Sequence, residues 1–134
     1  MKKVATNLVE AGARLRVGVE GAEGHEPDVQ MMFLMTSGEE LRDGQRPRPH
    51  GASLDIFGLR PHSRGHLRLA TADPLDPPLI DPRCLSDARD LALTLRGLRR
   101  GREIMAAKPM SRYIKAETEP GPKAETDEAL TEYV

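Results

Sequence analysis

The stretch that decides the fold runs from Leu59 to Asp87 and reads LRPHSRGHLRLATADPLDPPLIDPRCLSD. It opens with a turn over residues 60–65, in which Pro61 fixes φ near the start and Gly65 can accept a positive φ near the end. Residues 53–59 before the turn and 66–71 after it have the character of strands. In the second, two sets of side chains alternate between opposite faces, as in a sheet with one face exposed to solvent. The pattern predicts an antiparallel pair joined by this turn.

A connector over residues 73–85 follows the second of these strands. Four prolines between positions 74 and 82 exclude regular structure there. Asp73, Asp76 and Asp81 can each accept a hydrogen bond from a nearby backbone N–H, so we expect a stiff, extended segment. Carboxylates at this spacing also suggest a calcium loop, but the intervening prolines prevent the tight wrap that such a loop needs. The sequence therefore favours turn-forming aspartates and predicts no metal site.

A helix is predicted over residues 86–108, with Ser86 or Asp87 as its N-cap, Asp90 completing a box-like start and Pro109 ending it. Its apolar spacing places four side chains on one face: Leu91, Leu95, Leu98 and Met105. Gly97 and Gly101 each weaken the helix interior, and glycine at both positions therefore suggests that another element approaches the helix closely there. The acidic tail over residues 115–134 ends in a short helix that begins with Thr126 as its N-cap.

The first half of the chain is strand-rich over residues 13–72. Short strands are predicted at Leu15 to Val19 and at Val29 to Met35, and the second is apolar on both faces, which favours core on both. Alternatively, one face lines a substrate cavity through Gln30 and Met32. Polar loops are expected over residues 20–27 and 39–50. The predicted fold class is α+β, a mainly antiparallel sheet with flanking helices.

Composition limits the class of protein. The chain has 134 residues, enough for one domain, but only 3% are aromatic and none is tryptophan, so the core should be thin. A formal net charge of −1 gives no field that favours nucleic acid. No apolar run is long enough to span a membrane. The single cysteine, Cys84, fits a reducing compartment, so we predict a cytoplasmic protein.

The usual catalytic and cofactor-binding patterns are weak or absent. The four histidines, at positions 25, 50, 62 and 66, have no carboxylate at a spacing that implies a catalytic dyad and are interpreted as surface or turn residues. The arginines at positions 96, 99, 100 and 102 could bind phosphate or nucleic acid, but a solvated or ion-paired helix surface is favoured. No GxGxxG motif is present, so dinucleotide binding by the usual mechanism is not expected. We predict no catalytic, cofactor-binding or metal-binding residue.

The ordered series from Arg60 to Asp87 resembles the substrate domain of glucose-methanol-choline (GMC) oxidoreductases, choline-dehydrogenase-like members in particular. The resemblance covers most of the chain. It includes the segments EAGA at 10–13, EPDVQ at 26–30, GLR at 97–99, REIM at 102–105, EPGP at 119–122 and TDEAL at 126–130.

By resemblance, the domain is an antiparallel sheet with helices that roofs the substrate cavity over FAD in an enzyme that oxidises CH–OH groups. The family's FAD-binding half and its catalytic histidine match no position of this sequence. We therefore expect a partial substrate domain, residues 1–134, that is inactive alone and binds no FAD alone. Its expected partners are an FAD-binding domain and a small alcohol, and its orphaned apolar face is expected to promote self-association. The alternative is a free-standing, non-catalytic binding or interaction module.

Overall fold

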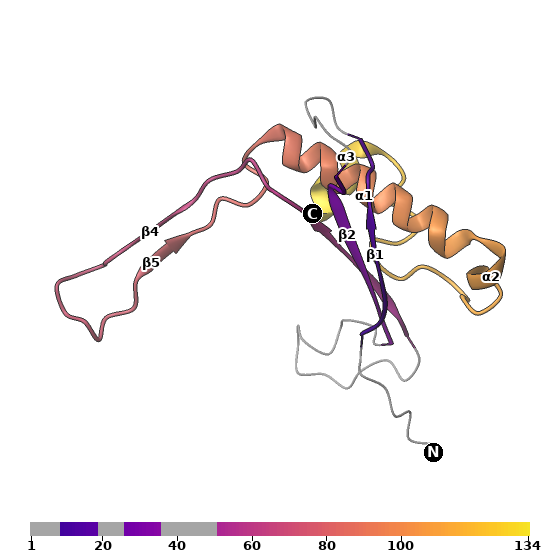
Figure 1. Cartoon of the computed structure of the whole chain (residues 1–134), viewed down its shortest axis with the longest axis horizontal. Coiled ribbons are helices and arrows are strands. Elements are labelled where there is room, and N and C mark those ends of the chain that lie inside the picture. The colour runs from indigo at the N-terminus through magenta and orange to yellow at the C-terminus, as the bar shows by residue number, and fades with distance from the viewer. Residues whose placement is uncertain (1–8, 19–25, 36–50) are drawn as a thin grey trace, which may run out of the picture.

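The structure, a computed structural model, describes residues 9–18, 26–35 and 51–134. A three-stranded antiparallel sheet lies against one long helix, and a narrow two-stranded arm extends away from both (Figure 1). Short helices follow the long one toward the C-terminus. The α+β class with antiparallel sheets is as predicted. The predicted loop over residues 39–50 and most of the loop over 20–27 lie outside the described residues, as does Val19.

The main sheet has β2 (Val29–Leu34) at its centre, between β1 (Val9–Leu15) and β3 (Ser53–Gly58). Met31 lies opposite Ala13 on one side and Ile56 on the other. The first strand starts earlier than predicted and ends at Leu15, where the predicted one began. The reason lies in Asp28, which is buried and accepts hydrogen bonds from the backbone N–H groups of Val17 and Gly18, at 2.8 and 3.1 Å, and so ends the ladder.

The core lies on one face of β2 only. Val29 and Met31 are 0% and 1% exposed and pack with Leu93 of the long helix. The partly buried side chains around them come from all three strands and the helix: Leu15, Val17, Leu54, Ile56 and Ile104. The opposite face, which carries Gln30 and Met32, is only partly buried. The prediction of core on both faces is therefore wrong, because no described helix covers the second face.

Helix α1 (Ala88–Ala106) is capped by Asp87, whose side chain accepts a hydrogen bond from the Arg89 N–H. Its sheet-facing side is narrow and carries Leu93 with Gly97 and Gly101, all buried. A Cβ on Gly97 would come within 2.8 Å of Ile56 Cγ2, and one on Gly101 within 3.2 Å of Ile56 Cδ1. The predicted close approach is confirmed, and the element that approaches is β3. The leucines predicted to share one face are instead half-buried beside this contact.

The predicted pairing of residues 53–59 with 66–71 is wrong. Strand β4 (His66–Arg68) pairs with β5 (Leu79–Asp81), and together they form the arm. Arg60 takes a left-handed φ of 58°, whereas Gly65 has no positive φ. Gly65 is required for a different reason, since a Cβ there would collide with the backbone carbonyl of Asp81. The prediction that the prolines exclude regular structure up to Pro82 is also wrong, because β5 lies within that segment.

The C-terminal segment returns along α1. Helix α1 ends at Ala106, two residues earlier than predicted, and Pro109 lies in the first turn of α2 (Lys108–Ser111) rather than directly ending α1. Helix α3 (Asp127–Tyr133) begins at the predicted N-cap, Thr126, and its Leu130 is fully buried.

Candidate functional site

The uncovered face of the main sheet is a surface that a substrate could contact. Residues directly opposite in neighbouring antiparallel strands share a face, and Gln30 lies opposite Arg14 and Phe57. Met32 in turn lies opposite Gly12 and Asp55. The face therefore combines one cationic, one amide, one thioether, one carboxylate and one aromatic group.

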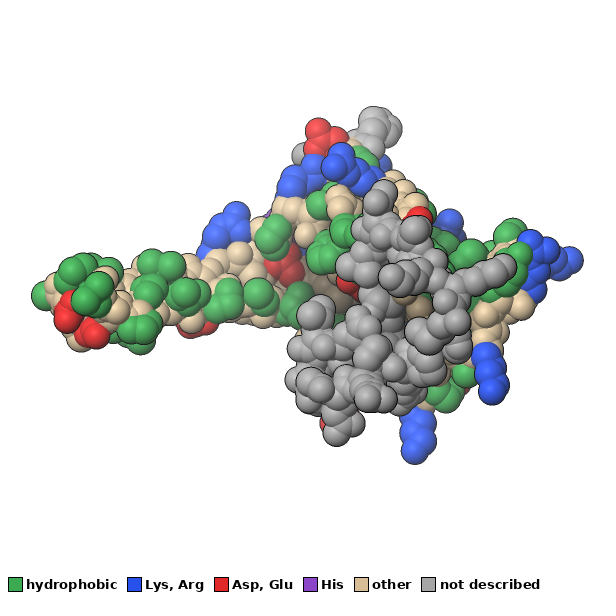
Figure 2. Space-filling view, turned by 90° about the horizontal axis from the view of Figure 1, so that it is seen from below, with side chains coloured by type: hydrophobic (Ala, Val, Ile, Leu, Met, Phe, Trp, Pro, Cys, Tyr) green, Lys and Arg blue, Asp and Glu red, His purple; other side chains and the backbone are tan. Residues whose placement is uncertain are grey.

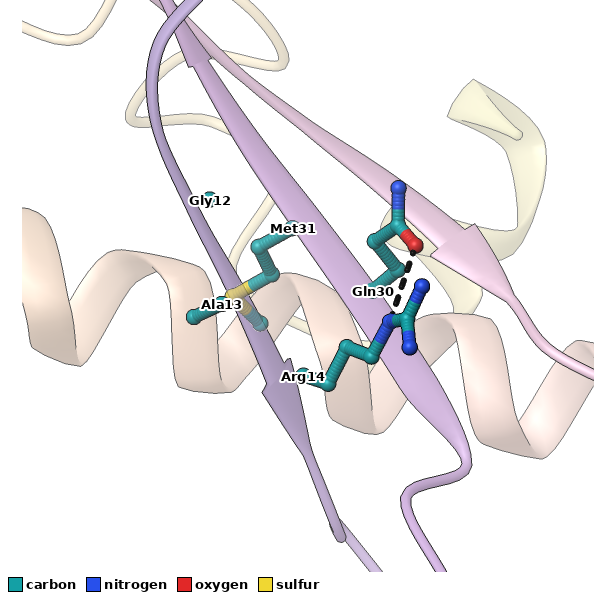
Figure 3. A pocket seen from close by; sticks show the side chains of 5 residues that line it. All are labelled: Gly12, Ala13, Arg14, Gln30 and Met31. Carbon is teal, nitrogen blue, oxygen red and sulfur yellow. Dashed lines mark hydrogen bonds between the residues drawn. The ribbon is translucent and has the colours of Figure 1, made fainter.

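A chain of polar contacts orders part of this face. Arg14 Nε donates to Gln30 Oε1 at 3.4 Å, and Gln30 Nε2 approaches Met32 Sδ at 3.4 Å. In Figure 3 the Arg14 and Gln30 side chains lie together on one side of the strands, while Met31 points to the other. Since Gln30 is held from both ends, its amide is oriented before any ligand arrives. The structure thus brings together the two side chains predicted to line a substrate cavity.

A shallow depression of about 240 Å³ lies along β1 and β2, lined by Gly12, Ala13, Arg14, Gln30 and Met31. It is smaller than the roughly 300–1,000 Å³ of a typical small-molecule site. This surface can form one wall of a cavity, but it cannot enclose a ligand alone. A second element would have to supply the opposite wall.

A second depression, of about 210 Å³, lies between Pro61 and Pro82 and the start of α1. Here the arm joins the body of the molecule, which consists of β1, β2, β3 and α1. Its buried carboxylate, Asp90, accepts hydrogen bonds from the backbone N–H groups of His62 and Ser63, at 2.8 and 2.7 Å, and from Ser63 Oγ at 2.5 Å. Burial alone raises the pKa of Asp90, but these hydrogen bonds outweigh it and leave the pKa below its ordinary value. All three donors are used to join arm and body, so the cluster is structural.

The start of α1 does not suit a phosphate. Asp87 holds this position and pairs with the Arg89 guanidinium at 2.9 and 2.7 Å. The hydrogen bond from that guanidinium holds the pKa of Asp87 well below its usual range, so the group is anionic at neutral pH. With buried Asp90 one turn further on, two carboxylates occupy the end of the helix dipole that would attract phosphate. This helix start therefore does not fit the pyrophosphate of FAD.

Other candidate residues have structural roles. Asp73 and Asp81 accept hydrogen bonds from the N–H groups of Leu75 and Arg83, as predicted for turns. In the described part of the chain, no group of three His, Cys, Asp or Glu side chains could hold a metal ion.

Three of the four arginines considered on α1 are ion-paired, and Arg96 is exposed, as predicted for a solvated or ion-paired surface. Arg99 pairs with Asp127, Arg100 with Glu103, and Arg102 with Glu117. Arg102 also donates to the carbonyl oxygens of Ala124 and Gly121, at 2.7 and 3.3 Å, and so fixes the segment before α3. Asp90, predicted to complete a box-like start of the helix with Asp87, binds the turn before the arm instead, and the Asp87 N–H donates to Ser63 Oγ.

Two histidines, His25 and His50, lie outside the described residues. Of the other two, His62 is exposed and His66 lies 3.9 Å from Asp81 across the arm, at the surface. Ser63 follows His62 in the chain, but its hydroxyl donates to Asp90 and so has a structural role. No helix of the described residues has the length and apolar character to cross a membrane.

Comparison with known proteins places this chain in a family. A family model described as GMC oxidoreductase matches residues 61–134. An alcohol dehydrogenase [acceptor] of Pseudomonas putida is 35% identical over 95% of this chain, and a fatty acid photodecarboxylase of Chlamydomonas reinhardtii is 33% identical over 98%. Choline oxidase of Arthrobacter globiformis also matches, at 36% identity over 81% of the chain.

These matches concern only a part of each relative. The chain spans 22%, 23% and 20% of the three proteins respectively. The crystal structure of pyridoxine 4-oxidase from Mesorbium loti superposes on 95% of the chain with a TM-score of 0.78 at 22% identity, and the match covers 25% of that protein. This likeness confirms the fold of both the body and the arm.

Proposed function

Because this chain belongs to the GMC oxidoreductase family, we propose that it supplies the substrate-facing sheet of an FAD-dependent enzyme that oxidises a CH–OH group to a carbonyl. The observation that carries the proposal is the uncovered face of the main sheet, on which Gln30 and Met32 lie side by side with no described element above them. A wall of this kind needs an opposite wall, and in such an enzyme the flavin and its domain would form it.

Each residue of this wall has a distinct role in the proposal. The Gln30 amide offers a hydrogen bond to a hydroxyl or a polar substituent, and Arg14 holds its orientation. Met32 supplies a polarizable, adaptable contact for the carbon skeleton. Proton abstraction and hydride transfer are assigned to residues and a cofactor that the described part of this chain does not supply. The free chain is accordingly expected to be inactive and free of flavin.

The relatives support alcohol chemistry more than any other reaction, because two of those named above are an alcohol dehydrogenase and a choline oxidase. The photodecarboxylase shows that a similar segment also serves a different reaction, which is why the substrate is assigned here only by class. A cytoplasmic location is proposed from the one cysteine, Cys84, which is free and exposed.

The test is a chimera in which this chain replaces the matching segment of the Pseudomonas putida enzyme. Alcohol-dependent dye reduction is expected for the chimera, and Gln30→Leu is expected to raise KM for the alcohol about threefold to tenfold through loss of one hydrogen bond. Arg96→Leu, on the exposed side of α1, is the control and should leave KM unchanged. A flavin-loaded chimera that reduces no dye with any alcohol would contradict the proposed function.

A further inference from the structure

The arm carries large apolar side chains in an unusually open position. Five of them are exposed by between 49% and 89%: Leu67, Leu69, Leu75, Leu79 and Ile80. Figure 2 shows this as a line of hydrophobic side chains along the arm, with a group of acidic side chains at its far end. Leu67 and Ile80 lie opposite each other in the register, so they share one face of the ribbon.

The arm receives no support from the body beyond its base. In the described structure, β4 and β5 contact each other and no other helix or strand. Strands of three residues with no third strand or helix are not stable as an isolated ribbon in water. Exposed leucines on an unsupported ribbon indicate a surface that becomes covered in the working protein.

Local chemistry nevertheless shapes the arm in advance. Asp76 accepts a hydrogen bond from the Thr71 hydroxyl at 2.5 Å, and Asp73 accepts one from the Leu75 N–H at 2.9 Å, which closes the tip. At the base, Ser63 is bonded to buried Asp90 and accepts a further hydrogen bond from the Asp87 N–H at 3.1 Å. Four prolines restrict the returning segment further. A preformed surface loses little conformational entropy when it binds.

We propose that this arm is the docking surface for the flavin-binding domain of a GMC oxidoreductase, with Leu67, Leu69 and Ile80 as its anchors. The inference rests on the proposed function, and it assigns the partner's contact to the arm in addition to the uncovered sheet face. The family model matches the whole arm, since its match begins at residue 61. In the pyridoxine 4-oxidase the match covers 25% of the chain, so three quarters of that protein is available to cover such an arm.

The size of the surface favours a domain over a second copy of this chain. At these exposed fractions, even all five residues together present on the order of 600 Å², although Leu79, opposite Arg68, lies on the other face of the ribbon from Leu67 and Ile80. This is below the roughly 800 Å² per partner that a stable complex of separate chains buries. A domain joined in the same polypeptide needs less area, because linkage gives it a high effective concentration. Few charges lie between the anchors, so the complementary surface should itself be apolar.

The experiment again uses the chimera with the Pseudomonas putida enzyme, with three variants of the arm and body. Leu69→Glu and the double variant Leu69→Glu/Ile80→Glu place charge on the arm, and Tyr113→Glu is the matched control, since Leu69 and Tyr113 are both 74% exposed. Flavin absorbance after gel filtration and the melting temperature are measured for each. The arm variants should lose flavin and melt about 5 °C or more below the unmodified chimera, and the control should match it.

Each outcome decides the proposal. The proposal would be overturned by arm variants that retain flavin and have the same melting temperature as the unmodified chimera. It would also be overturned if the arm amides exchanged hydrogen as fast in the folded chimera as in the free chain. If the arm variants only abolish a dimer of the free chain, the occupant is a second copy and the proposal is wrong. A chimera that needs the arm to hold flavin but oxidises no alcohol would leave the docking surface standing and reject the proposed function.

Discussion

The body and the arm of this molecule are built on different physical principles. The body, formed by β1, β2, β3 and α1, is held by burial: Val29 and Met31 are almost fully buried against Leu93. The arm has no core, and its shape comes from turns, prolines and the carboxylate at its base. Hydrogen bonds and prolines can therefore fix the course of a short extended segment without apolar packing. Its apolar side chains then remain available to a partner.

The largest expected effect is a loss of stability when the core of the body is truncated. Met31→Ala removes a side chain that is 1% exposed at the centre of the sheet–helix contact. We expect it to lower the free energy of unfolding by about 2–5 kcal/mol through lost burial and a residual cavity. Met35→Ala, at a site that is 48% exposed, should change it by less than about 0.5 kcal/mol. Equal shifts in urea midpoints would mean that the core does not lie on this face.

The next effect tests the junction between the two regions. Asp90→Asn removes the charge that three donors share and is expected to cost about 2–3 kcal/mol in unfolding free energy. Asp76→Asn, at the exposed tip of the arm, is the control and should cost less than about 1 kcal/mol. An Asp90 variant as stable as its control would show that the junction is not held by this carboxylate.

The same carboxylate predicts a pH dependence. Because the folded pKa of Asp90 lies below its ordinary value, its contribution to stability is present above about pH 4 and is lost as the pH falls through the folded pKa. Urea midpoints between neutral and strongly acidic pH should therefore fall more steeply for the unmodified chain than for Asp90→Asn. Parallel curves for the two proteins would contradict the assignment.

A smaller effect measures how closely α1 approaches β3. Gly97→Ala brings a methyl within 2.8 Å of Ile56, so an overpacking cost of about 1–3 kcal/mol exceeds a helix-propensity gain of about 1 kcal/mol. Gly101→Ala meets only flexible side-chain ends at 3.2 and 3.3 Å and should be close to neutral. If Gly97→Ala is the more stable of the two in thermal unfolding, the helix lies farther from the sheet than described.

The smallest effect is expected in the arm itself. In the free chain, Leu69→Glu should change the free energy of unfolding by no more than about 0.5 kcal/mol, because the side chain is 74% exposed and touches no core. Tyr113→Glu provides the matched change on the body. A loss of stability comparable to that of Met31→Ala would place the arm against the body and remove the contrast between the two regions.

Sequence reasoning was most accurate where local chemistry determines the result. The cap at Asp87, the start of α3 at Thr126 and the turn roles of Asp73 and Asp81 follow from a residue and its near neighbours, and the structure contains them all. The two helix glycines also signalled a close contact correctly. The family resemblance, carried by the order of short motifs, was confirmed as well.

Long-range pairing was less predictable. The proline and glycine between residues 53–59 and 66–71 predict a hairpin. Instead, Asp90, 27 positions from Ser63, accepts hydrogen bonds from the backbone N–H groups of that turn, and the chain leaves the sheet there. Asp28 similarly ends the first ladder by binding residues 10 and 11 positions away. Buried carboxylates that cap distant turns carry no local sequence signal beyond a polar residue next to an apolar run.

The proposed wall of the substrate cavity was only partly accessible to the same reasoning. Alternation along Val29 to Met35 placed Gln30 and Met32 on one face, and the structure agrees. Their neighbours on that face, Arg14, Asp55 and Phe57, come from strands whose register the sequence did not determine.

The most direct test of the contrast between body and arm is native-state hydrogen exchange of the free chain, followed by segment. Amides of β2 and of the middle of α1 should exchange only through global unfolding, whereas those of β4 and β5 should exchange much faster despite their hydrogen-bonded pairing. Equal protection of the arm and the body would contradict the account, because it would mean that the arm belongs to the same cooperative unit as the core.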